Sequence, residues 1–131
     1  MRKLSSVLLV DDDETTNFLN AYLLQRLGVT DQVLEARNGE EALSLLARHC
    51  APPATTCPSL VLLDINMPVM GGIDFLEAYQ SKPPVPAIRV AILTTSVHPA
   101  DLQRLQVLPH IALLHKPLTQ EKIEGLLQEH F

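Results

Sequence analysis

The 131-residue sequence has no long apolar run. Its N-terminal apolar segment, Val7-Leu8-Leu9-Val10, is too short for the core of a signal peptide and runs straight into three aspartates. No segment approaches the roughly 20 apolar residues that a membrane-spanning helix needs. We therefore expect a cytoplasmic chain that does not contact a membrane.

A basic stripe and a cysteine framework are also lacking. The 10 Lys and Arg residues are scattered among 15 acidic ones, for a net charge of −5, which argues against nucleic-acid binding. The two cysteines, Cys50 and Cys57, do not have the spacing of metal ligands. We expect both to be free thiols in a reducing cytoplasm.

What the sequence does contain is five short apolar segments that alternate with helical patterns. The length and the 47% apolar content predict a single domain over residues 1–131, with no output domain attached. Strands are predicted at Val7–Val10, Val33–Ala36, Leu60–Leu63, Val90–Leu93 and Ile111–Leu114. Four of them are nearly continuous apolar runs, typical of parallel strands covered on both faces, whereas the second carries Glu35 and fits an edge. The alternation predicts an α/β fold with a doubly wound parallel sheet.

Five helices are predicted between and after the strands. The first has an apolar stripe at helical spacing and ends at Gly28; the stripe consists of Phe18, Leu19, Tyr22, Leu23 and Leu27. Asn38 and Thr119 are the predicted N-caps of the second and fifth helices. Phe75, Leu76 and Tyr79 mark the third, and Pro99 begins a short fourth helix that buries little beyond Leu102 and Leu105. Ala51–Ser59 and Ser81–Ala87 are Pro-rich connectors.

Polar residues follow four of the strands. Asp11-Asp12-Asp13 follows the first strand, Asp64 the third, Thr94-Thr95-Ser96 the fourth and Lys116 the fifth. Ligands of such sheets bind beyond the carboxyl ends of the strands, so these groups should converge. Converging carboxylates repel one another and need a cation, and oxygen ligands suit Mg²⁺. Each element alone has an ordinary explanation as a cap, a turn or a solvated charge, but their joint placement predicts a phosphoryl site.

The pattern resembles the receiver domains of two-component response regulators over essentially the whole chain. The matching motifs are Val10-Asp11-Asp12-Asp13, Leu63-Asp64-Ile65-Asn66-Met67-Pro68 through Gly71-Gly72, Leu93-Thr94-Thr95 and His115-Lys116-Pro117-Leu118. The resemblance implies a flavodoxin-like sheet with strand order 2-1-3-4-5 and helices on both faces. It also implies that the chain is a signalling protein that accepts a phosphoryl group, and not an enzyme that turns over a substrate.

The resemblance assigns roles to individual residues. Asp64 is the phosphoacceptor, and Thr94 and Lys116 contact the phosphoryl oxygens. Asp11, Asp12, Asp64 and the main chain of Asn66 hold Mg²⁺ or Mn²⁺, and Lys116-Pro117 is a candidate cis peptide. The implied donor is a sensor histidine kinase or a histidine phosphotransfer protein. The downstream partner is unknown, and we expect a monomer or a weak homodimer.

Two positions depart from the family pattern. Leu113 stands where many members have a Tyr or Phe that rotates on activation, so the conformational change is expected in Thr94–Pro99 and the helix after it. Gly71 stands where many members have an acidic residue, which should affect only a turn.

Two other functions fit parts of the sequence. Asp11-x-Asp13-x-Thr15 resembles the nucleophile motif of haloacid dehalogenase-like phosphatases, but the later acidic pair of that family is missing and Asp64 is left unexplained. A pseudo-receiver, which has the fold without phosphorylation, normally loses an acidic residue or the lysine, and this chain keeps them all.

Overall fold

The computed structural model describes residues 3–81 and 88–131. Its elements in chain order are β1 (Val7–Val10), α1 (Glu14–Arg26), β2 (Val33–Ala36), α2 (Gly39–His49), β3 (Leu60–Leu63), α3 (Gly72–Ser81), β4 (Arg89–Thr94), α4 (Pro99–Leu105), β5 (Ala112–His115) and α5 (Gln120–His130). The predicted connector at 81–87 lies, apart from Ser81, outside the described residues. Within the described ranges, no helix is both long and apolar enough to span a membrane.

The five strands form one parallel sheet in the order β2-β1-β3-β4-β5. This confirms the predicted doubly wound, flavodoxin-like fold and the edge position of β2. β5 is the other edge, and Ala112, Leu113 and Leu114 are only half-buried in it. The register sets Val10 beside Leu63, so β1 and β3 end level with each other and the residues that follow them meet at one edge.

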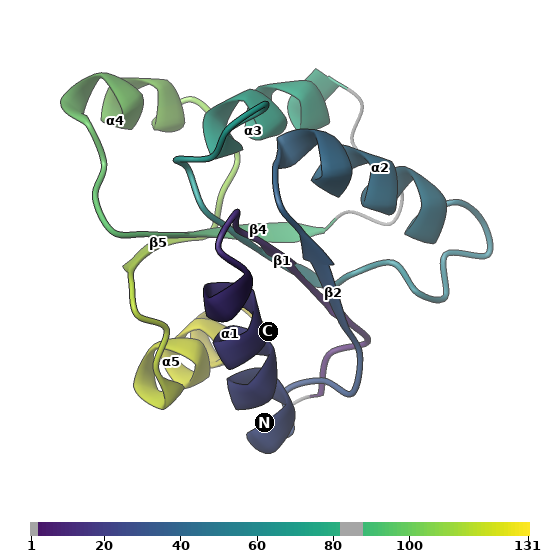
Figure 1. Cartoon of the computed structure of the whole chain (residues 1–131). Coiled ribbons are helices and arrows are strands. Elements are labelled where there is room, and N and C mark those ends of the chain that lie inside the picture. The colour runs from purple at the N-terminus through teal and green to yellow at the C-terminus, as the bar shows by residue number, and fades with distance from the viewer. Residues whose placement is uncertain (1–2, 82–87) are drawn as a thin grey trace.

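Alternation along the strands divides the interior into two apolar layers. One layer contains Leu8, Val61 and Ile92 and is covered by α2, α3 and α4. The other contains Leu9, Leu62 and Leu93 and is covered by α1 and α5. Figure 1 shows these two groups of helices on opposite faces of the sheet.

The helix ends follow from local hydrogen bonds. Asn38 accepts from Glu41 N–H and Thr119 accepts from Lys122 N–H, which confirms both predicted N-caps. Pro99 occupies the start of α4, where its missing N–H costs nothing. Gly28 follows the end of α1 with φ +73°, a conformation that glycine adopts without steric cost.

The apolar stripe predicted on α1 faces the core only in part, because Leu23 and Leu27 are partly buried against the layer that contains Leu9 while the other three members are exposed. Phe18, Leu19 and Tyr22 are 67%, 57% and 60% exposed, whereas Asn17 and Leu24 are buried. Asn17 and Leu24 are seven residues apart and therefore share one side of the helix, which packs on the sheet. The helix carries apolar residues on more than one side, so spacing alone did not identify the face that is fully buried. Leu102 of α4, also expected to be buried, is 45% exposed.

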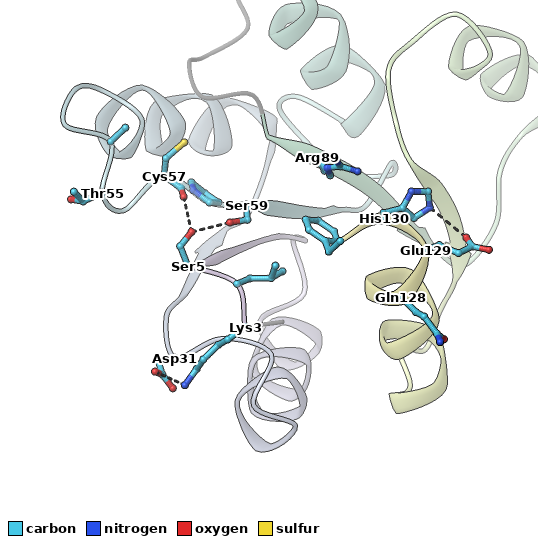
Figure 2. A pocket seen from close by; sticks show the side chains of 14 residues that line it. Lys3, Ser5, Asp31, Thr55, Cys57, Ser59, Arg89, Gln128, Glu129 and His130 are labelled. Carbon is cyan, nitrogen blue, oxygen red and sulfur yellow. Dashed lines mark hydrogen bonds and ion pairs between the residues drawn. The ribbon is translucent and has the colours of Figure 1, made fainter. Parts of the chain in front are cut away.

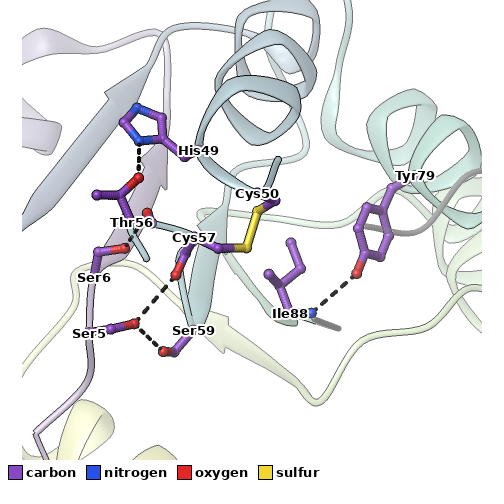
Figure 3. The surroundings of a disulfide bond; sticks show 9 residues. All are labelled: Ser5, Ser6, His49, Cys50, Thr56, Cys57, Ser59, Tyr79 and Ile88. Carbon is purple, nitrogen blue, oxygen red and sulfur yellow. Dashed lines mark hydrogen bonds between the residues drawn. A yellow bond between two sulfur atoms is a disulfide. The ribbon is translucent and has the colours of Figure 1, made fainter. Parts of the chain in front are cut away.

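Cys50 and Cys57 form a disulfide, so the prediction of free thiols is wrong. The intervening chain turns back on itself through hydrogen bonds from Ala54 N–H to Ala51 O (2.7 Å) and from Cys57 N–H to Ala54 O (3.3 Å). These turns bring the two Cα atoms to 4.4 Å, within bonding range of the thiols. Figure 3 shows the disulfide at the end of α2, with the Ser5 hydroxyl donating to the Cys57 carbonyl on the other side of the loop.

Candidate functional site

Asp11 and Asp13, the first and third of the three aspartates after β1, have different tasks. Asp11 is 5% exposed; its N–H donates to Ala36 O (3.0 Å), and its Oδ1 accepts from Asp13 N–H (2.9 Å). Asp13 is exposed and caps α1, accepting from Thr15 N–H and the Thr16 hydroxyl. The Thr16 hydroxyl is the main reason that the pKa of Asp13 lies below its usual value. The carboxylate of Asp13 therefore serves as the N-cap of α1, whereas that of Asp11 is directed toward the carboxyl edge of the sheet.

Asp64 stands at the same edge, directly after β3. Its N–H donates to Val10 O (2.9 Å), which continues the ladder between the two central strands. The residue is 6% exposed, and this burial raises the pKa of its carboxyl, although the positive charge of Lys116 opposes the shift. The site therefore holds a carboxylate that is costly to ionise unless a cation is near.

Lys116 supplies one cation. It follows β5, where its N–H donates to Thr94 O (2.9 Å), and its peptide bond to Pro117 is cis, as predicted. The Lys116 Nζ lies 2.5 Å from Asp11 Oδ2 and 3.5 Å from Asp64 Oδ2. Burial alone would lower the pKa of Lys116, but the hydrogen bond to Asp11 and the two carboxylate charges outweigh it and raise the pKa.

One carboxylate oxygen from each of Asp11, Asp12 and Asp64 lies within 4.8 Å of the other two. Asp12 is exposed and reaches the group from the solvent side. Three hard oxygen donors at one point could bind a metal ion, and a divalent ion together with Lys116 would balance their three negative charges. The residues present therefore fit the predicted metal.

The other two predicted residues meet at the Ser96 carbonyl oxygen. The Thr94 hydroxyl, fully buried at the end of β4, donates to it at 3.2 Å, and Asn66 Nδ2 donates to it at 3.4 Å. Asn66 N–H also lies 3.5 Å from Asp64 Oδ1. The loop after β4 is thus tied to the loop that carries the candidate acceptor.

Glycines after β3 allow this loop to close. A Cβ at position 71 would lie 2.8 Å from Ile65 O. A side chain at this position would press on the backbone one residue beyond Asp64, so Gly71 allows a close approach of the chain within this turn.

One buried contact was missed by the sequence analysis. Asn17 in α1 donates from Nδ2 to the main-chain oxygen of Asp11 (2.9 Å) and is 2% exposed. It lies seven residues before Leu24 on the same side of the helix, and a polar residue at a core position is the signal that could have identified it.

Two hollows lie away from the acidic group. One, of about 1020 Å³, is at the opposite end of the sheet, where Ser5, Ser59 and Arg89 line it (Figure 2). Ser59 precedes β3 and Asp64 follows it, so the strand separates this hollow from the acidic group. A groove of about 360 Å³ runs between α1 and the Lys116-Pro117 segment, with Tyr22 in its wall.

Comparisons with known proteins agree with this geometry. Residues 7–128 match the response regulator receiver domain family. A probable chemotaxis protein CheY from Rhizobium etli is 34% identical over 125 residues, which cover 95% of this chain and 91% of that protein. A probable methanogenesis regulatory protein FilR2 from Methanothrix harundinacea is 32% identical over 123 residues, covering 94% and 79%. The structure of a two-component response regulator from Cytophaga hutchinsonii superposes with a TM-score of 0.84 at 27% identity, covering 98% of this chain and 97% of that one.

Proposed function

Because this chain belongs to the response regulator receiver domain family, we propose that Asp64 accepts a phosphoryl group from a phosphohistidine. The donor is a sensor histidine kinase or a histidine phosphotransfer protein in the cytoplasm. The observation that carries the proposal is the convergence of Asp11, Asp12 and Asp64 beside Lys116.

In the transfer, a carboxylate oxygen of Asp64 attacks phosphorus. The phosphorus–nitrogen bond of the donor breaks, and its electron pair remains on the imidazole. Asp64 must be ionised to attack, and Lys116, 3.5 Å away, favours the ionised form. The burial of Asp64 excludes most water from the attacking group.

The metal site consists of Asp11, Asp12, Asp64 and the main-chain carbonyl of Asn66. Bound there, Mg²⁺ or Mn²⁺ would offset the negative charge of the phosphoryl oxygens. Lys116 offsets the same charge from the protein side. Because it already pairs with Asp11, it can turn toward a phosphoryl oxygen without being newly buried.

The Thr94 hydroxyl links the chemistry to the surface. It now donates to Ser96 O, and in the phosphorylated protein it donates to a phosphoryl oxygen instead. Losing this hydrogen bond releases the loop before α4, which changes the surface presented to a downstream partner.

The phosphatase alternative is weakened by the position of Asp13. Its carboxylate is occupied by Thr15 and Thr16 as the cap of α1, so it does not join the acidic group. A pseudo-receiver would share this fold and would differ in failing to accept a phosphoryl group.

Incubation with acetyl phosphate and Mg²⁺ tests the proposal. The chain should gain the mass of one phosphoryl group on Asp64, and Asp64→Asn should gain none. Asp13→Asn is the matched control and should label normally. No label on the unaltered chain would indicate a pseudo-receiver, and label or continuous turnover that survives Asp64→Asn but not Asp13→Asn would favour the phosphatase.

A further inference from the structure

Asn17 has a buried side chain whose oxygen lacks a hydrogen-bond partner among the described residues, and this burial costs stability. The residue is 2% exposed, and the oxygen concerned is Oδ1. An unpartnered buried amide oxygen destabilises a fold, and a leucine of similar size on this face of α1 would avoid the penalty. The amide therefore needs another reason to be there.

The other end of the amide suggests the reason. Nδ2 donates to the main-chain oxygen of Asp11 at 2.9 Å. The flipped amide is disfavoured because it would set Asn17 Oδ1 against that oxygen, and the two would repel. The remaining polar groups of Asp11 are held by Ala36, Asp13 and Lys116. With Asn17 on the carbonyl, every polar group of Asp11 is restrained, although the residue lies beyond the end of β1.

Asn17 also lines a small cavity together with both buried aspartates of the acidic group. The cavity, of about 10 Å³, is lined by Asn17, Asn20, Asp11 and Asp64 together with apolar residues of the central strands. A rotation of the Asp11 peptide would therefore move its carboxylate relative to that of Asp64.

We propose that Asn17 is a positioning residue for the metal site: it fixes the Asp11 peptide so that the Asp11 carboxylate stays aligned with that of Asp64. This inference rests on the proposed function. Partners behind metal ligands commonly change metal affinity ten-fold or more when they are removed.

Asn17→Leu separates positioning from stability. The variant loses the donor to Asp11 but also loses the unpartnered oxygen. We expect about ten-fold weaker Mn²⁺ binding, measured by electron paramagnetic resonance, and the same loss for Mg²⁺ in an NMR titration. The melting temperature of the metal-free protein should be unchanged or higher.

Asn20→Leu is the matched control. Asn20 lies one turn along α1 and lines the same cavity, but no hydrogen bond joins it to Asp11 among the described contacts. It should bind Mn²⁺ as the unaltered chain does. Asn17→Ser provides a smaller replacement if leucine prevents folding, and it should also weaken binding because its hydroxyl is too short to replace the amide.

The results distinguish this inference from the proposed function. If the unaltered chain binds neither ion, the metal site itself is wrong and the role of Asn17 fails with it. If the unaltered chain binds and the folded Asn17 variants bind equally well, the positioning role alone is refuted. A fall in melting temperature that accounts for the lost affinity, shared by Asn20→Leu, would show that Asn17 only packs.

Discussion

A Cβ atom at Gly72 would lie 2.4 Å from the main-chain oxygen of Asp64. The first residue of α3 therefore touches the backbone of the candidate phosphoacceptor, and only glycine fits there without a shift of the backbone.

Gly72→Ala should lower the free energy of unfolding by about 2 kcal/mol or more, because the clash is with the main chain and not with a flexible side chain. Urea denaturation measures the change. Gly125→Ala in α5 is the matched control: its Cβ would meet nothing within 4 Å, so alanine should stabilise the helix by about 0.5–1 kcal/mol. Equal effects of the two substitutions would contradict the close contact at Gly72.

Asp64→Asn should stabilise the metal-free protein at neutral pH. Burial raises the pKa of Asp64, so the folded state binds this proton more tightly than the unfolded state. The resulting stability is present below the unfolded pKa of 3.8 and is lost as pH rises through the raised folded value. At pH 7 the amide should raise the free energy of unfolding, and below pH 4 the difference should shrink.

Asp13→Asn is the control for this measurement, because the pKa of Asp13 is lowered and its ionised form favours folding. It should gain no stability at pH 7. A stabilised Asp13→Asn, or an Asp64→Asn that is less stable at pH 7 than the unaltered chain, would contradict the cost assigned to the buried carboxylate.

Reduction of the Cys50–Cys57 disulfide should lower the free energy of unfolding by about 2 kcal/mol, the effect expected from cutting a short cross-linked loop. Urea denaturation with and without dithiothreitol measures it. The variant with both cysteines changed to serine should not respond to the reductant. Two thiols that react with an alkylating agent in the absence of reductant would mean that the sequence-based prediction was right and the disulfide does not form.

Serine substitutions on the exposed face of α1 should be almost neutral. Phe18→Ser and Tyr22→Ser should each change the free energy of unfolding by less than about 0.5 kcal/mol, because both side chains are already largely in solvent. Leu24→Ala, on the buried face, should cost about 2–5 kcal/mol. If Phe18→Ser or Tyr22→Ser instead cost more stability than Leu24→Ala, α1 would pack on the sheet through the face that carries Phe18 and Tyr22.

The conformational response to phosphorylation should be concentrated around α4. This helix buries only Leu105, and Leu113 offers no aromatic ring to swing inward. Beryllofluoride, a phosphate mimic, should therefore shift backbone NMR signals more over residues 97–108 than in α2. We also expect the downstream partner to contact α4, β5 and α5. Shifts of equal size in α2 would contradict this path for the signal.

The sequence was sufficient for the sheet because buried parallel strands must be continuous apolar runs, and it predicted β1, β2 and β3 to the residue. It was also sufficient to bring Asp11 and Lys116 together, since the ends of parallel strands share one edge. It could not orient α1, whose apolar residues occupy more than one side. It could not predict the disulfide either, because the turns at Ala51–Cys57 that bring Cys50 to Cys57 are set by backbone hydrogen bonds that residue spacing does not encode.

The two apolar layers have a consequence for how this chain can change over evolutionary time. Leu8 and Leu9 are neighbours in sequence, but Leu8 belongs to the layer covered by α2, α3 and α4 and Leu9 to the layer covered by α1 and α5. A substitution at one can be compensated only by residues on its own side of the sheet, so the two layers can diverge separately. Homologues can therefore differ greatly in the packing under α1 and α5 while retaining that under α2, α3 and α4, and covariation between adjacent strand residues should be weaker than covariation two residues apart.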